Sequence, residues 1–241
     1  AFLQGCNLRC GCCHNPDTWD CSQGKEYTSE QVFERVLKYK SYFGNDGGIT
    51  LSGGEPLLQP EFAKEIFSLC KSDGINTCLD TSGSILNDEV QKLIAVTDRV
   101  LLDIKYSDEE KYKKYAGCTL GKVLEFLDFL EQHSVPVTLR QVIIPGLNDD
   151  CENILKLCSI ANSHSCVDKV ELLPFRKICK VKYAVVCCAI LSDYTSAVKT
   201  EHYGQFLQSY VVDNTVVGAL HKGRVDVAER NLARCGNACR E

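Results

Sequence analysis

The chain has 241 residues, a formal net charge of −5, 44% hydrophobic residues and 24% charged residues. This composition is ordinary for a folded globular protein and excludes a disordered, collagen-like or coiled-coil chain. The basic residues are scattered, which disfavours nucleic acid as a partner. No apolar run is long enough to predict a membrane span.

Two residue counts are unusual, because the chain has 16 cysteines and no methionine. The sequence does not open with a basic stretch followed by an apolar segment, so it shows no secretory signal. We therefore expect a cytoplasmic protein with reduced thiols and a metal site rather than a disulfide framework. The lack of methionine predicts a processed chain or a fragment, with a truncated N-terminus and part of the first strand missing.

Apolar runs typical of strands alternate with helical patterns along the first 175 residues. In chain order, the pattern predicts strands at residues 1–3, 48–51, 75–80, 99–104, 136–144 and 167–174. Helices are predicted at residues 28–43, 60–72, 87–96, 120–132 and 149–162, the first with a Thr28-x-x-Gln31 capping box. This alternation favours an α/β fold with a parallel sheet, either doubly wound or curled into a full or partial barrel.

A distinctive short motif closes or follows each predicted strand. Ligands of parallel α/β folds bind at the carboxyl ends of the strands, so these motifs predict one ligand-binding rim. In chain order they are the cysteine-rich segment 5–15, Ser52-Gly53-Gly54-Glu55-Pro56, Asp80-Thr81-Ser82-Gly83, Asp103-Ile104-Lys105, Pro145-Gly146 and Leu173-Pro174-Phe175.

The strongest motif is the C-x3-C-x2-C spacing of Cys6, Cys10 and Cys13. Three thiolates on one loop can hold one face of a metal centre, and a four-iron cluster held by three cysteines keeps one iron open to a ligand. The spacing leaves other readings open. His14 could complete a zinc site, Cys12 could replace one of the three ligands, or all of these thiols could be buried and inert.

The cysteine loop, followed by Gly53-Gly54-Glu55, resembles the radical S-adenosylmethionine (SAM) superfamily. The longer segment 3–19 and the later rim motifs, in the same order, resemble the activating enzymes of glycyl radical enzymes, most closely those that act on pyruvate formate-lyase. The match covers about residues 1–183. It implies a radical SAM core domain over 1–183, folded as a partial (β/α)6 TIM-like barrel with outer helices, and a C-terminal tail, 184–241, of unpredicted structure.

The resemblance also implies an activity. Cys6, Cys10 and Cys13 would hold a [4Fe-4S] cluster and be catalytic, and the reduced cluster would cleave SAM to a 5′-deoxyadenosyl radical. That radical would remove a hydrogen atom from a glycine of pyruvate formate-lyase. The expected electron donor is flavodoxin or ferredoxin, and the expected quaternary state is a monomer. One cluster is expected, because only Cys21 lies between Cys13 and Gly53.

The remaining roles are likewise implied by the family. Asp80, Thr81 and Asp103, with the backbone carbonyl of Leu101, would hold a monovalent cation, since hard cations prefer oxygen ligands. The resemblance assigns SAM contacts to Cys12, His14, Gly53, Gly54, Glu55, Lys105 and Arg140. Cys12 departs from the family, which usually carries an aromatic residue there. The alternatives are an activator of anaerobic ribonucleotide reductase or of another glycyl radical enzyme, and a zinc-binding interaction module.

Overall fold

The computed structural model describes residues 1–175 and Lys182. The predicted tail, 184–241, lies outside the described residues, as do residues 176–181 and 183 of the expected core domain. The strands within the described part are β1 (Phe2–Leu3), β2 (Gly48–Gly53), β3 (Asn76–Thr81), β4 (Arg99–Asp103), β5 (Val137–Ile143) and β6 (Val167–Pro174).

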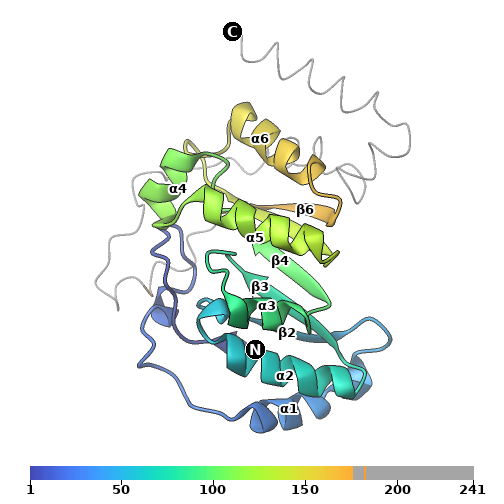
Figure 1. Ribbon diagram of the computed structural model, residues 1–241. Coiled ribbons are helices and arrows are strands. Elements are labelled where there is room, and N and C mark those ends of the chain that lie inside the picture. The colour runs from blue at the N-terminus through green and yellow to red at the C-terminus, as the bar shows by residue number, and fades with distance from the viewer. Residues whose placement is uncertain (176–181, 183–241) are drawn as a thin grey trace.

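All neighbouring strands are parallel, and their order in the sheet is their order in the chain, β1 to β6. The crossovers carry α1 (Ser29–Leu37), α2 (Pro60–Ser72), α3 (Asp88–Ile94), α4 (Glu109–Ala116), α5 (Leu120–Gln132) and α6 (Cys151–Asn162). Figure 1 shows a curved wall of strands with α1 and α2 beside one end and α6 beside the other. β1 and β6 are the two edges and do not pair, so the fold is the expected partial (β/α)6 barrel.

The helices begin where their capping residues predict. The Thr28 hydroxyl accepts from the Gln31 backbone N–H, and the Gln31 side chain accepts in return from the Thr28 N–H. The α2 and α5 bounds coincide with the predicted ranges 60–72 and 120–132. The first helix is shorter than its prediction of 28–43, because α1 ends at Leu37 and a separate 3-10 turn follows at Lys40–Tyr42.

Helix α4 was missed by the sequence prediction, because its eight residues carry no apolar stripe and only Tyr112 and Ala116 are buried. Its ends do carry capping signals. The Asp108 carboxylate accepts from the Lys111 N–H at the start, and Gly117 takes a left-handed conformation, φ +76°, at the end. These are the residues that favour a helix N-cap and C-cap.

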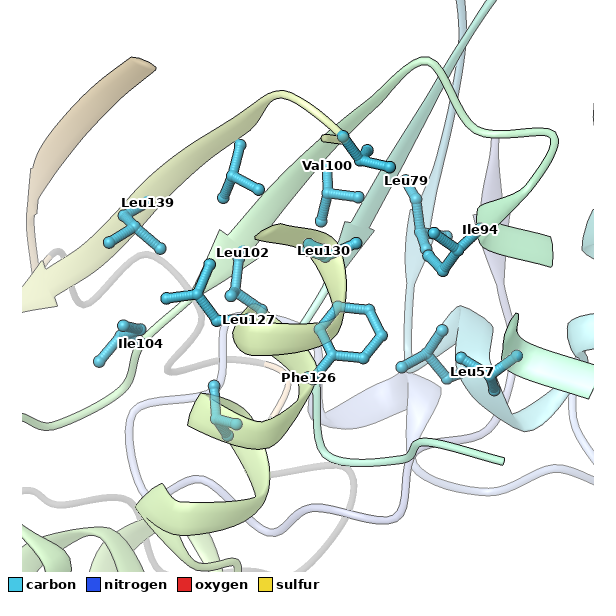
Figure 2. Close-up of a cluster of buried hydrophobic side chains, with 14 of the residues drawn as sticks. Leu57, Leu79, Ile94, Val100, Leu102, Ile104, Phe126, Leu127, Leu130 and Leu139 are labelled. Atoms are coloured by element: carbon cyan, nitrogen blue, oxygen red, sulfur yellow. The ribbon is translucent and has the colours of Figure 1, made fainter. Parts of the chain in front are cut away.

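The alternation of side chains along each strand separates the core from the site. Figure 2 shows Phe126, Leu127 and Leu130 of α5 packed among Leu102 and Leu139 of the sheet, all fully buried. Since successive strand residues point to opposite faces, the neighbours of these strand leucines face the inside of the barrel. Within the described residues, no helix combines the length and the apolar character that a membrane span needs.

Candidate functional site

Three charged residues of adjacent strands meet on the inner face of the barrel. Asp103 and Arg140 are paired in the β4–β5 register, and Asp80 lies on the neighbouring strand β3. The Arg140 Nε donates to Asp103 Oδ1 at 2.9 Å, and an Arg140 Nη donates to Asp80. Lys105 Nζ donates to the other oxygen of Asp103 at 2.7 Å. The four side chains form one charge quartet, each 17–22% exposed.

In the quartet, burial disfavours the charged form of each side chain, and the neighbouring opposite charges favour it. Burial raises the pKa of Asp80, and the nearby Asp103 raises it further. Burial acts in the same direction on Asp103, but the charges of Lys105 and Arg140 outweigh it and hold the pKa of Asp103 below its usual value. Burial would lower the pKa of Lys105, yet Asp103 and other groups raise it well above its usual range. Two positive and two negative charges therefore sum to zero here.

The predicted cation ligands thus have protein partners. Arg140 and Lys105 occupy oxygens of Asp80 and Asp103, and the Thr81 hydroxyl donates to Glu55. Leu101 lies opposite Asp80 in the β3–β4 register. Among residues 1–175 and Lys182, no three His, Cys, Asp or Glu side chains are grouped to hold a single metal ion. The monovalent cation stays a prediction.

Glu55 is almost fully buried, 1% exposed, and both of its carboxylate oxygens accept hydrogen bonds from the chain. One oxygen accepts from the Leu57 N–H, at 3.1 Å, and from the Thr81 hydroxyl. The other accepts from the Ser82 N–H, at 2.9 Å, and from the Ser82 hydroxyl. Burial raises the pKa of Glu55 in spite of these donors. Glu55 therefore connects the loop after β2 to the end of β3 by hydrogen bonds, a structural role that the sequence alone did not indicate.

Gly53 and Gly54 are required by the close approach of two backbones. A Cβ on Gly54 would lie 2.0 Å from the Gly5 carbonyl oxygen, and Gly53 has φ +116° beside the backbone of Leu3. The Glu55 N–H then donates to the Gly5 carbonyl at 2.7 Å. The two glycines thus press the loop after β2 against the start of the cysteine loop, and both also line the cavity described next.

The cysteine loop is anchored at several points by backbone hydrogen bonds. The Arg9 and Gly11 N–H groups donate to the last carbonyls of α4, at Ala116 and Tyr115. Figure 1 shows this loop, in dark blue, reaching α4. On the other side, the Asn7 side chain donates to the Ser84 hydroxyl at 3.0 Å. The helix that sequence patterns missed is therefore one of the supports of the thiol loop.

Cys6, Cys10, Cys12 and Cys13 all line one cavity of about 150 Å³, together with Gly53, Gly54, Glu55, Asp80, Thr81 and Lys105. Burial raises the pKa of each of the four thiols, that of Cys12 to about 11. Burial keeps these thiols protonated, and a bound metal would deprotonate its ligands outright. This donor set fits an iron–sulfur cluster, whose thiolates bind different iron atoms, better than a single zinc ion, whose ligands converge on one point.

His14 also lines the thiol cavity, and its ring stacks on Phe175 with centroids 5.9 Å apart and an interplanar angle of 16°. Phe175 follows β6, so residues from the two ends of the described core meet here. The guanidinium of Arg9 lies 5.2 Å from the ring centroid of Trp19, another residue of the cavity. These planar groups can present a stacking surface to a planar ligand.

A larger cavity, about 1270 Å³, lies elsewhere, against the β1 edge and helices α1 and α2. Its lining is mainly apolar and includes Phe2, Tyr39 and Phe62, with Cys21 as its one cysteine. We place the candidate site at the smaller cavity, because the clustered thiols, the buried carboxylate of Glu55 and two of the four quartet residues, Asp80 and Lys105, line it. Asp103 and Arg140 are not among its lining residues and reach it through these partners.

Comparison with known proteins points to one family. The Radical SAM superfamily profile matches residues 1–158. A pyruvate formate-lyase-activating enzyme from Clostridium pasteurianum is 46% identical over 183 residues, 76% of each chain. A crystal structure of a domain of the pyruvate-formate lyase-activating enzyme from Bacteroides vulgatus has TM-score 0.50 and 27% identity, and the match covers 61% of this chain and 94% of that one.

A second structure supports the fold alone. Streptococcus suis SuiB bound to its precursor peptide superposes with TM-score 0.66 at 12% identity, covering 87% of this chain and 44% of that one. The family itself is shown by the profile match and by the 46% identical relative. The chain belongs to the radical SAM superfamily and, within it, to the family of pyruvate formate-lyase-activating enzymes.

Proposed function

We propose that this radical SAM enzyme generates the glycyl radical of pyruvate formate-lyase by abstracting a hydrogen atom from a glycine of that partner. The observation that carries the proposal is that four thiols, a glycine-lined wall and two members of the charge quartet, Asp80 and Lys105, line one cavity. The 46% identity to a pyruvate formate-lyase-activating enzyme supports the choice of partner over anaerobic ribonucleotide reductase.

The proposed roles divide the cavity lining by chemistry. Cys6, Cys10 and Cys13 would hold a [4Fe-4S] cluster, which when bound supplies the electron that cleaves SAM. Lys105 lines the cavity and Arg140 shares the carboxylate of Asp103 with it. We assign both to a ligand carboxylate, a group that suits a guanidinium.

The other lining residues would shape the rest of the ligand site. The Gly53 and Gly54 backbone lies bare at the cavity wall, since neither residue has a side chain to cover it. The stacked pair of His14 and Phe175 suits a planar base. Glu55 and Cys12 would bound the same pocket, Glu55 by fixing its wall.

An anaerobic assay tests the activity. After reconstitution, the full chain should bind about four iron and four sulfide and form 5′-deoxyadenosine from SAM under a strong reductant. Cys6→Ala, Cys10→Ala and Cys13→Ala should each lose the cluster, whereas Cys12→Ala and the exposed control Cys21→Ala should retain it. A colourless zinc protein would overturn the proposal. Loss of the cluster in Cys12→Ala but not in Cys13→Ala would overturn the ligand assignment.

The protein partner needs a separate measurement. Mixed with SAM, reductant and pyruvate formate-lyase, the reconstituted chain should give the electron paramagnetic resonance signal of a glycyl radical. A signal only with anaerobic ribonucleotide reductase would favour the alternative partner. We further propose flavodoxin or ferredoxin as electron donor, a monomeric state and a cytoplasmic location, which donor titration, light scattering and cell fractionation would test.

A further inference from the structure

Tyr106 carries an unexplained polar group one residue beyond Lys105, which lines the candidate site. It follows Lys105 in the loop after β4 and is 1% exposed. Within residues 1–175 and Lys182, its hydroxyl is the only fully buried side-chain polar atom without a hydrogen-bond partner. Buried hydroxyls nearly always find a partner, because their desolvation is otherwise uncompensated. This exception belongs to the same buried cluster as Cys10, so we infer that its partner arrives with the group that the thiols bind.

The surroundings of Tyr106 connect it to the cysteine loop. Its ring contacts two tyrosines of α4, with centroid distances of 6.2 Å to Tyr112 and 5.6 Å to Tyr115. The Tyr112 hydroxyl already accepts from the Lys105 N–H, at 3.3 Å. The Tyr115 carbonyl accepts from the Gly11 N–H, at 3.0 Å, between two cavity-lining cysteines. Helix α4 therefore contacts both Tyr106 and the thiol loop.

The electrostatics of the hydroxyl agree with this placement. Burial contributes most to a raised pKa of Tyr106, and the next contributions come from Cys12 and Cys10. Cys10 is itself a buried residue of this loop. The sulfur of a neutral thiol is only a weak acceptor. A metal-bound thiolate carries charge and is a much better one.

We propose that Tyr106 is a positioning residue for the iron–sulfur cluster, its hydroxyl donating a hydrogen bond to a sulfur atom of the bound cluster. The inference rests on the proposed function, since it needs the cluster. A hydrogen bond to sulfur stabilises the reduced cluster, which carries one more negative charge, and so raises its reduction potential. Tyr106 thereby makes the one-electron reduction that precedes SAM cleavage easier.

The substitution Tyr106→Phe removes this donor and keeps the ring. In the reconstituted full chain, we expect the ratio of reduced to oxidised cluster at a fixed potential to fall about tenfold, a downward shift of about 59 mV for one electron. A redox titration followed by electron paramagnetic resonance measures this shift. Tyr42→Phe, at a side chain 84% exposed, is the matched control and should leave the potential unchanged. An unchanged potential in Tyr106→Phe overturns the inference.

Thermal unfolding gives a second readout that does not depend on activity. In the metal-free chain, Tyr106→Phe should raise Tm, because it removes an unpaired buried hydroxyl. In the cluster-loaded chain, the same change should lower Tm or leave it unraised, because a hydrogen bond is lost. An equal rise in both forms, or no rise in the metal-free form, overturns the inference. A wild-type chain that binds no iron and sulfide refutes the proposed function and this inference together.

Discussion

Glu55→Gln tests whether the buried Glu55 carboxylate holds the loop after β2 against the end of β3. The wild-type carboxylate accepts four hydrogen bonds, two at each oxygen, from Leu57, Thr81 and Ser82. Glutamine keeps one acceptor oxygen and replaces the other with an NH₂ group. The NH₂ group must then face a pair of donors that now point at the carboxylate.

The cost follows from which donors can adapt. The hydroxyls of Thr81 and Ser82 can rotate to accept from the new NH₂ group, but a backbone N–H cannot. Either orientation of the amide therefore leaves one buried backbone N–H unpaired, that of Leu57 or that of Ser82, at about 1–3 kcal/mol. The remaining bonds also lose the charge that strengthened them. Removing a buried charge offsets part of this loss, because burial raises the pKa of Glu55. We expect a net destabilisation of about 3 kcal/mol.

Urea unfolding of the metal-free chain at pH 7 measures this value without any contribution from cofactor binding. The matched control is Glu34→Gln, an exposed position on α1, which should stay within about 0.5 kcal/mol of the wild type. The slope of free energy against urea should be the same for all three proteins, so that the midpoints report stability. A loss below about 1 kcal/mol for Glu55→Gln would refute the view that this carboxylate fixes the wall.

Three further pairs of measurements follow. Gly54→Ala should lower the free energy of unfolding by more than about 2 kcal/mol, measured by thermal unfolding, because its Cβ would lie 2.0 Å from a backbone oxygen. Gly121→Ala, with open space around it, should raise the free energy of unfolding by about 0.5 kcal/mol. Arg140→Gln should cost about 3 kcal/mol in urea unfolding, because it leaves Asp80 without a cationic partner and Asp103 with Lys105 alone. Arg99→Gln, in an exposed ion pair, should cost under about 1 kcal/mol, and equal costs would contradict the importance of burial. Nearby donors hold the pKa of Glu131 at about 2, below its usual 4.5, so its charge stabilises the fold above pH 4.5 and this gain is lost as the pH falls toward 2. The difference in free energy of unfolding between wild type and Glu131→Gln should therefore narrow as the pH falls from 7 to 4. A difference that widens over this range would contradict the lowered pKa of Glu131.

Sequence patterns predicted the strands and most helices, because both carry their periodicity in local side chains. The predicted strand at 167–174 has the bounds of β6, and 60–72 has those of α2. The patterns failed at α4, where Lys and Glu cover the helix and two buried residues are too few to form a stripe. Asp108 and Gly117 were the available signals, and reading caps without an apolar face would have found this helix.

The sequence could predict that the charged residues lie at one rim of the sheet, but it could not predict which of them pair with each other. Each charged residue of the quartet could be assigned to a strand end, and parallel strands bring such ends to one rim. The partner of each charge depends on register and side-chain length, which no single strand encodes. Glu55 shows the same limit, since its donors Thr81 and Ser82 lie 26 and 27 residues away. The unpaired hydroxyl of Tyr106 could be recognised only once every neighbour was known.

The charge quartet joins two roles that the family resemblance gives separately, a monovalent cation at the aspartates and an arginine for a ligand carboxylate. Asp80 and Asp103 are already balanced by Arg140 and Lys105. A further monovalent cation would raise the net charge of this buried group from zero to +1, which is costly away from water. A carboxylate that arrives with a ligand would return the sum to zero. Cation and carboxylate binding should therefore favour each other, because each removes the charge imbalance that the other would create.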